Sequence, residues 1–273
     1  MLRSMFSAVS GLRSHQTMMD ITGNNIANVN TAGYKATRTT FQETLNQVVR
    51  GGNAGGAAQG GVNPMQIGLG AQVGATDLVF GQGAFQATGR ATDIAIQGEG
   101  FFQVETGEGT FYTRAGAFSF DNDGNLVGPG GERVVGDDGE PIRLDLDDYS
   151  EIAIGGNGVI TGRLNADDGD PDTDVGDIVE LSTLRLVTFA NPEGLTKAGN
   201  GLFADSAASG VPQLGTPGGD GFGSLQSGTL EMSNVDLAQE FTNLILSQRG
   251  FQANARTITT SDELLQELVN LKR

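Results

Sequence analysis

Residues 1–34, MLRSMFSAVSGLRSHQTMMDITGNNIANVNTAGY, carry apolar side chains at alternating intervals of three and four positions. The seam consists of Leu2, Met5, Val9, Leu12, Gln16, Met19, Gly23 and Ile26. This spacing predicts an amphipathic helix about 40 Å long at a rise of about 1.5 Å per residue. No proline interrupts the helix, and Gly33 follows it as a stop signal.

The C-terminal residues repeat the pattern. Their seam consists of Leu237, Phe241, Leu244, Gln248, Phe251, Ala255, Ile258, Asp262, Leu265 and Val269, and Leu264, Leu268 and Leu271 form a second stripe. Ser233 and Asp236 resemble a capping box at its start. Gly250 costs this helix about 1 kcal/mol relative to Ala, so packing must stabilise that turn.

Two helices that bury one face each leave partly apolar faces uncovered. We expect neighbouring copies of the chain to cover those faces. The alternative is an intramolecular hairpin that closes a globular domain.

The middle of the chain reads as short strands separated by Gly, Asp and Asn turns, and Asp121–Asn125 is a hairpin signal. The predicted fold class is α+β, with long N- and C-terminal helices forming a coiled-coil-like core domain and a mainly antiparallel β-rich central domain. The predicted ranges are 1–34 and 230–273 for the helical core, 35–74 for a Gly-rich connecting segment, and 75–229 for the β-rich outer domain. Within the connecting segment, 51–61 reads as a flexible linker.

Composition excludes several classes of protein. The 273 residues contain no Cys, which excludes thiol catalysis and thiolate metal sites, and one His with three Lys leaves little for general-base chemistry. The net charge of −17 opposes binding to nucleic acid, and no apolar run approaches the ~20 residues that cross a bilayer. Residues 51–229 carry a net charge of −18, whereas both ends are nearly neutral and suit contact between like molecules.

Motifs for chemistry are nearly absent, and we predict no catalytic, cofactor-binding or metal-binding residues. Calcium prefers clustered carboxylates, but the aspartates of loop 167–177 do not fit an EF-hand register. A solvated acidic loop is the simpler interpretation. A calcium-dependent β-rich binding module and a carboxylate hydrolase remain as alternatives. His15 lies off the helix seam, where we expect it to be exposed.

Residues 20–35, DITGNNIANVNTAGYK, resemble the N-terminal signature of bacterial flagellar rod and hook axial proteins. Residues 88–127 resemble the β-rich core of that family, and residues 230–273 resemble its C-terminal helix. Asparagine side chains donate and accept hydrogen bonds at once, so Asn24, Asn25 and Asn28 can bridge neighbouring copies. Gly33 permits a sharp turn, after which Tyr34 can pack back on the helix end.

The resemblance implies a non-enzymatic subunit of a hollow helical homopolymer. The sequence QRGFQANARTITTSDE (248–263) resembles hook subunits, which form a flexible joint that transmits torque, and the alternative is a distal rod, or drive-shaft, subunit. The expected subunit-interface residues are Leu2, Met5, Val9, Leu12, Met19, Asn24, Asn25, Ile26, Asn28, Gly33, Tyr34, Leu237, Phe241, Leu244, Phe251, Ile258, Leu265 and Leu268.

The same resemblance implies partners and a location. The expected partners are other copies of the chain, the flagellar rod, the hook cap, the hook–filament junction proteins and the type III export apparatus. The N-terminus lacks the apolar core of a signal peptide, so the expected location is the flagellum after export independent of such a signal.

Overall fold

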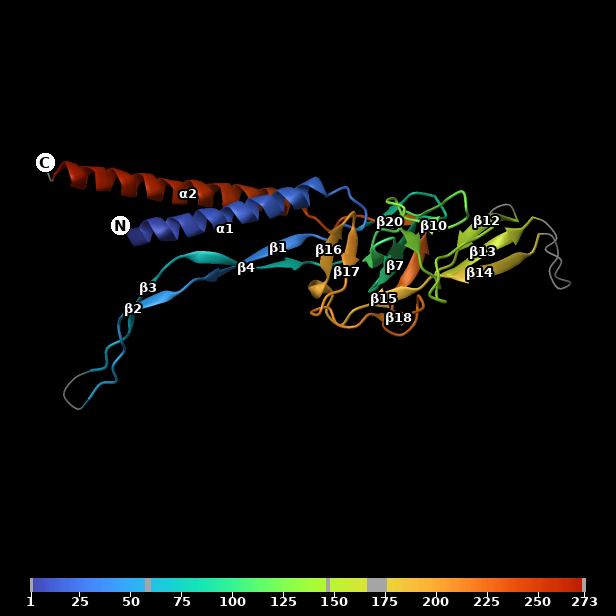
Figure 1. The fold of residues 1–273 in the computed structure, drawn as a ribbon, viewed down its shortest axis with the longest axis horizontal. Coiled ribbons are helices and arrows are strands. Elements are labelled where there is room, and N and C mark those ends of the chain that lie inside the picture. Colours follow the sequence, from blue (N-terminus) through green and yellow to red (C-terminus); the bar gives the residue numbers. More distant parts are fainter. Residues whose placement is uncertain (1, 57–59, 146–147, 166–175, 272–273) are drawn as a thin grey trace. The chain divides into compact units, whose positions relative to one another are not determined.

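A computed structural model describes residues 2–56, 60–145, 148–165 and 176–271 (Figure 1). The chain divides into two compact units and passes between them four times. Unit 1 comprises Met1–Ala27, Thr37–Leu78 and Asp236–Arg273, and unit 2 comprises Asn28–Ala36 and Val79–Val235.

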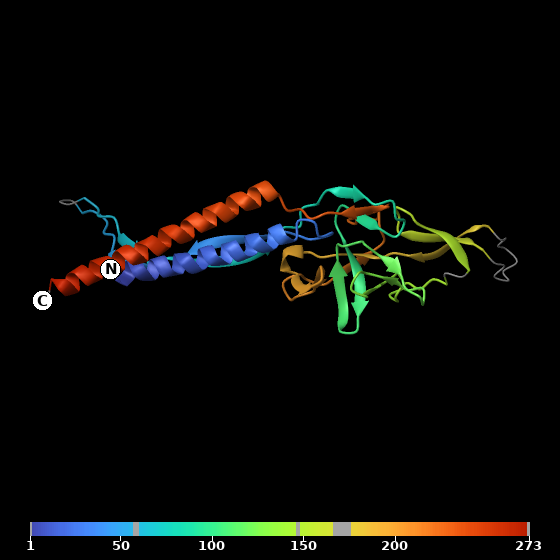
Figure 2. The same ribbon diagram turned by 90° about the horizontal axis from the view of Figure 1, so that it is seen from above.

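Unit 1 contains the two predicted helices, α1 (Leu2–Ala27) and α2 (Leu237–Asn270), which lie side by side (Figures 1 and 2). Asp236 caps α2, because its carboxylate accepts hydrogen bonds from the backbone N–H groups of Ala238 and Gln239. The presence and approximate extent of both helices were therefore predictable from the seams.

The predicted coiled-coil-like core is wrong, because α1 and α2 meet through small and polar side chains. The fully buried side chains described on the two helices are Ala8, Ser14, Thr22, Asn25, Ser247 and Ser261. Gly11 lies against Asn254, and Gly250 lies against the imidazole of His15. The backbones thus approach closely, whereas a coiled coil would interlock large apolar side chains.

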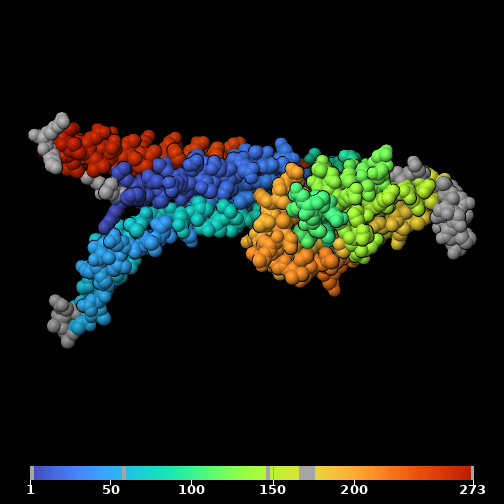
Figure 3. All heavy atoms as spheres, in the orientation of Figure 1, coloured from blue at the N-terminus to red at the C-terminus, as the bar shows by residue number. Residues whose placement is uncertain are grey.

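Unit 1 also contains two antiparallel ribbons, which a helical core domain would lack. Strands β1 (Thr37–Glu43) and β4 (Ala71–Leu78) form one ribbon, and β2 (Asn46–Arg50) and β3 (Met65–Gly68) form the other. α1 contacts both β1 and β4, and its atoms lie between those of α2 and β4 in the space-filling view (Figure 3). The range 35–74, predicted as a connecting segment, contains three of these strands and the start of the fourth. Residues 57–59, within the predicted linker, lie outside the described residues.

Unit 2 is built from strands, and every strand pair that the described ranges contain is antiparallel. Its elements are β5 (Phe85–Ala87), β6 (Ile94–Gln97), β7 (Phe101–Thr106), β8 (Gly109–Thr113), β9 (Ser119–Phe120), β10 (Leu126–Val127), β11 (Arg133–Val134), β12 (Tyr149–Ile154), β13 (Val159–Leu164), β14 (Ile178–Thr183), β15 (Leu186–Thr188), the 3-10 turn η1 (Pro192–Gly194), β16 (Thr196–Gly199), β17 (Leu202–Ala204), β18 (Gln213–Gly215), β19 (Ser224–Ser227) and β20 (Thr229–Glu231). This confirms the α+β class with a mainly antiparallel centre.

The largest sheet of unit 2 has nine strands. Its path runs β16-β17-β8-β7-β11-β10-β9, and β15 pairs with both β7 and β18. Strands β12, β13 and β14 form a second sheet, while β6 pairs with β19 and β5 pairs with β20. The predicted Asp121–Asn125 hairpin joins β9 to β10, and Gly124 there has a φ of +80°.

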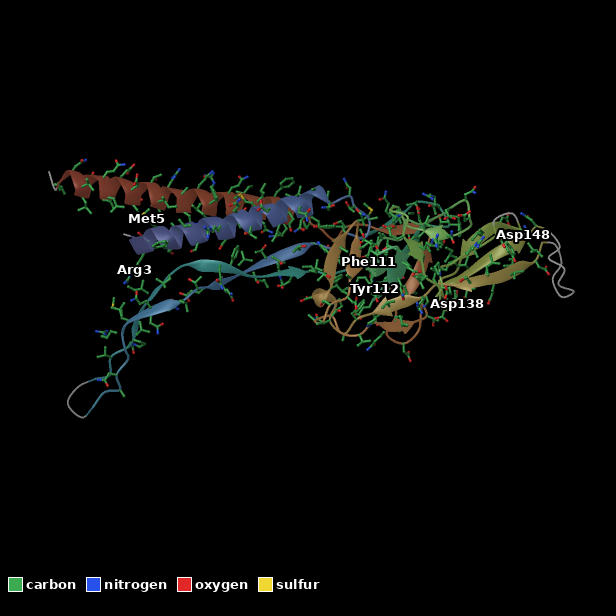
Figure 4. All side chains as sticks on the ribbon, viewed as in Figure 1. Arg3, Met5, Phe111, Tyr112, Asp138 and Asp148 are labelled. Carbon is green, nitrogen blue, oxygen red and sulfur yellow. The ribbon has the colours of Figure 1, made fainter. Side chains whose placement is uncertain are left out.

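The apolar core of unit 2 lies among these sheets. Phe102 and Phe118 are at most 1% exposed and stack edge to face with ring centroids 5.1 Å apart. Phe111 and Tyr112 are neighbours on β8 (Figure 4), and Tyr112 packs edge to face against Phe189. Consecutive residues of β6 and β7 are buried, so both faces of these strands are covered by apolar packing.

Candidate functional site

The described residues offer little for catalysis. Among them, no group of three or more His, Asp or Glu side chains is placed to hold a metal ion. The aspartates of the predicted acidic loop from Asp167 to Asp174 lie outside the described residues. Neither α1 nor α2 is apolar enough over sufficient length to cross a membrane.

The predicted interface residues differ widely in exposure. Val9, Asn24, Leu237, Phe241 and Leu268 are exposed, and Asn25 and Gly33 are buried. The half-buried ones are Met5, Leu12, Met19, Ile26, Asn28, Tyr34, Leu244, Phe251, Ile258 and Leu265, and the side chain of Leu2 is not described. The first turns of α1 project Arg3 and Met5 (Figure 4).

A shallow groove runs between α1 and β4 in unit 1. Its volume is about 360 Å³, and its lining includes Phe6, Val9, Arg13, Gln72 and Val73. Phe6 is 71% exposed at the edge of this groove. An aromatic side chain that remains in water costs free energy that a second protein surface can recover.

The β2–β3 ribbon and α2 add further exposed apolar side chains to unit 1. All nine residues of the two strands are exposed. On α2, Ile245 and Leu246 are 56% and 60% exposed. An isolated two-stranded ribbon is marginally stable in water, so β2 and β3 require further packing.

Asn25 lies at the end of α1 and is used within unit 1. Its Nδ2 donates to the backbone oxygen of Thr37 at 2.9 Å and to Oε1 of Glu240 at 3.2 Å. Its Oδ1 accepts from the backbone N–H of Thr37 at 3.0 Å. The side chain that we expected to bridge copies thus joins α1, β1 and α2 of one chain.

Gly33 and Tyr34 follow α1 in unit 2. Gly33 has a φ of +70°, and a Cβ built on it would lie 2.5 Å from the backbone nitrogen of Ala115. Only glycine therefore fits both the left-handed turn and the close approach. The ammonium of Lys197 lies 4.5 Å from the ring centroid of Tyr34 in a cation–π arrangement.

His15 is half-buried, so its expected exposure is wrong. Its ring lies against Gly250 and is 6.1 Å from the ring centroid of Phe41. The cause is the absence of a side chain at Gly250, which leaves room for the imidazole.

A buried ion cluster in unit 2 was missed by sequence reasoning. Glu231 is 1% exposed, and its carboxylate accepts from Nζ of Lys35 and from Nε of Arg114, each at 2.7 Å. Arg114 also donates to the backbone oxygens of Ile96, Gly98 and Gly100.

The charges of the cluster do not balance, because one carboxylate faces two cations. Burial opposes ionisation of Glu231, but Arg114 and Lys35 outweigh it and hold the pKa of that carboxyl below its usual range. Burial lowers the pKa of Lys35 despite its contact with Glu231, and the nearby positive charge of Arg114 lowers it further. Lys35 and Glu231 are 196 positions apart, so no local pattern links them.

Comparisons with known proteins identify three matching family models. The model "Flagella basal body rod protein" matches residues 5–35. The model "Flagellar hook protein FlgE/F/G D1 domain" matches residues 95–162, and "Flagellar basal body rod FlgEFG protein C-terminal" matches residues 226–271.

Individual relatives match along their whole length. The chain is 48% identical to the flagellar basal-body rod protein FlgG of Bacillus subtilis (strain 168) over 274 aligned positions that cover all of both chains. It is 37% identical to FlgG of Agrobacterium fabrum, covering 96% of this chain and 97% of that one. It is 30% identical to the flagellar hook protein FlgE of Borreliella burgdorferi over 441 positions that cover both chains in full.

Proposed function

The chain belongs to the family of flagellar rod and hook proteins and is thus a component of the bacterial flagellum, and on this premise we propose that it is a subunit of the distal rod. The distal rod is the drive shaft that carries motor torque outward. The role is structural and includes no catalytic step. The comparisons favour this assignment over the hook subunit predicted from residues 248–263.

One observation carries the choice of rod over hook. The alignment with the Bacillus subtilis rod protein spans 274 positions for 273 residues, so the two chains match almost position for position. The alignment with the Borreliella burgdorferi hook protein spans 441 positions, 168 more than this chain has residues. At least 168 positions of that alignment therefore have no counterpart in this chain.

The rod subunit acts as a homopolymer whose contacts are concentrated in unit 1. The exposed apolar side chains of α1, α2 and the β2–β3 ribbon supply the driving force when copies cover them. The predicted interface residues that are exposed, such as Leu237 and Phe241, are part of this surface.

Charge supports a contact between the α1–β4 groove and the end of α2 in another copy. The groove contains Arg13 beside Phe6 and Val9. The last turns of α2 carry Glu263 and Glu267 next to the exposed Leu264 and Leu268. Such a contact joins different surfaces of two copies, and contacts of that kind build open helical assemblies.

The other partners of the chain follow from its proposed position in the flagellar rod. Copies at the two ends of the assembly contact other rod proteins and the hook, and the subunit leaves the cell through the flagellar type III export apparatus. Junction and cap proteins are then neighbours of the hook and not of this chain.

Immunogold electron microscopy of isolated flagella with attached basal bodies tests the assignment. We expect gold on the straight shaft below the hook. Gold on the curved hook would overturn the rod assignment in favour of the hook. An antibody that binds the purified chain but labels neither structure would reject both.

A substitution tests the proposed polymer surface. Leu237→Asp should prevent assembly of the purified chain, because it places a charge in an apolar contact. Val211→Asp is the matched control, since Val211 is 81% exposed in unit 2. Normal tubes from Leu237→Asp, or equal loss in both variants, would contradict the placement of the contact in unit 1.

A further inference from the structure

Three short segments of unit 2 include all four points at which the chain passes between the units. They are residues 28–36, 79–83 and 231–235. Any force that one unit exerts on the other along the chain therefore reaches unit 2 through these segments. Three side chains, those of Lys35, Glu231 and Asn234, connect these segments to each other.

Lys35 and Glu231 connect all three segments. Nζ of Lys35 donates to Oε1 of Glu231 at 2.7 Å and to the backbone oxygen of Gly81 at 2.9 Å. The same Oε1 accepts from the backbone N–H of Gly83 at 2.9 Å. The backbone oxygen of Glu231 accepts from the N–H of Gly33 at 2.8 Å.

Asn234 connects the same three segments a second time. Its Oδ1 accepts from the backbone N–H of Ala36 at 2.8 Å. Its Nδ2 donates to the backbone oxygens of Val79 at 2.7 Å and Gly81 at 3.0 Å. Both bridges end on backbone atoms, so no segment can slide without breaking several hydrogen bonds.

Burial makes the Lys35–Glu231 bridge difficult to open, whereas Asn234 is only half-buried. Lys35 and Glu231 are each 1% exposed, so water cannot replace a lost partner. Removing one member of such a pair leaves an unpaired buried charge, which costs far more than an exposed ion pair contributes. Loss of the Lys35–Glu231 pair thus releases all three segments together, whereas loss of Asn234 releases only the hydrogen bonds that its own side chain makes.

We propose that Lys35, Glu231 and Asn234 form a clasp that distributes mechanical load among the chain segments entering and leaving unit 2. The clasp prevents any one segment from being peeled away alone. Its purpose rests on the proposed function, because a drive shaft carries torque. Its existence as a cooperative unit does not, and the tests below use the isolated full-length chain.

Hydrogen exchange tests the cooperativity. In Glu231→Gln, amide exchange at Gly33, Ala36 and Gly83 should accelerate about 100-fold, because two buried cations lose their anion. Amides of the β7–β8 pairing should keep their protection. Equal acceleration throughout unit 2 would overturn the clasp, because Glu231 would then merely stabilise the whole fold.

Two further variants keep the test decisive. Glu151→Gln is the control, since Glu151 forms an exposed ion pair with Arg163 in the same unit and should change no rate. Asn234→Ala breaks the second bridge without leaving a charge unpaired. Asn234→Ala should selectively accelerate amide exchange at Ala36, and this result does not depend on whether Glu231→Gln folds. Unchanged exchange at Ala36 would overturn the proposal.

Single-molecule pulling tests the load-bearing role. The chain has no cysteine, so handles can be attached through Asn30→Cys and Val235→Cys alone. With the clasp intact, unit 2 should open in one event. Asn234→Ala should add an earlier step at lower force, as the end segments peel first. One event at an unchanged force would overturn load sharing, whatever immunogold shows about rod or hook.

Discussion

Units 1 and 2 differ in where they keep their apolar side chains. Of the 25 buried apolar residues among the described ranges, 23 belong to unit 2, and only Ala8 and Leu78 belong to unit 1. Of the 23 large apolar residues that are exposed, 18 belong to unit 1. Unit 2 therefore encloses its own apolar core, whereas unit 1 leaves most of its large apolar side chains exposed, as a surface that binds other molecules does.

The difference shows that one chain can combine a domain that buries its apolar side chains with a domain that leaves most of them exposed. The two are spectroscopically separable, since the three tyrosines lie in unit 2 and both long helices lie in unit 1. Tyrosine fluorescence thus reports on unit 2, and helical circular dichroism reports on unit 1.

The largest expected effect comes from the core of unit 2. Phe102→Ala should lower its free energy of unfolding by about 3–5 kcal/mol, because it leaves a cavity. Phe241→Ala, at a 50% exposed position of unit 1, should cost the monomer less than about 1 kcal/mol yet impair assembly. Urea unfolding followed by both signals checks the pair. Equal losses of unfolding free energy in the two variants would contradict the proposed difference between the units.

Replacement by alanine should change stability in opposite directions at two glycines. Gly33→Ala should destabilise unit 2 by about 2–3 kcal/mol, because of its positive φ and its contact with Ala115. Gly23→Ala should stabilise α1 by about 0.5–1 kcal/mol, since nothing lies within 4 Å of the added Cβ. Thermal unfolding of each variant measures both effects, and a stable Gly33→Ala would mean that the turn is not constrained.

A pH titration should affect unit 2 through Glu231. Because Arg114 and Lys35 hold its folded pKa below the ordinary value of 4.5, its contribution is present above pH 4.5 and is lost as pH falls through the folded pKa. The tyrosine-detected stability of wild type should therefore fall more steeply below pH 4.5 than that of Glu231→Gln. Parallel slopes would show that Glu231 does not stabilise through its charge.

A further small effect concerns the helix contact of unit 1. Gly250→Ala should destabilise α2 by about 1 kcal/mol despite the better helix propensity of Ala, because the methyl group meets His15. His15→Ala combined with Gly250→Ala should recover that loss in the circular dichroism signal. If Gly250→Ala alone is stabilising, the ring moves aside freely and the contact is loose.

The sequence pattern predicted elements better than contacts. Three-four spacing located both helices because local periodicity follows from helix geometry. It did not predict the contacting faces. The spacing of large apolar residues carries no information on the close helix approach at Gly11 and Gly250. The ribbons were missed because the Gly-rich residues 51–61, which connect β2 to β3, resemble a linker. Lys35 lies in the N-terminal signature (20–35) and Glu231 lies in the C-terminal one (230–273). Only folding of the chain brings the two residues together.

The exposed apolar surface of unit 1 has a thermal consequence. Covering it in the proposed polymer removes nonpolar surface from water, so assembly carries a negative heat-capacity change and gains little from enthalpy near room temperature. Such contacts weaken on cooling. The proposed polymer would then be held together most firmly in warm cells, while the stability of unit 2, with its own core, changes little over the same range.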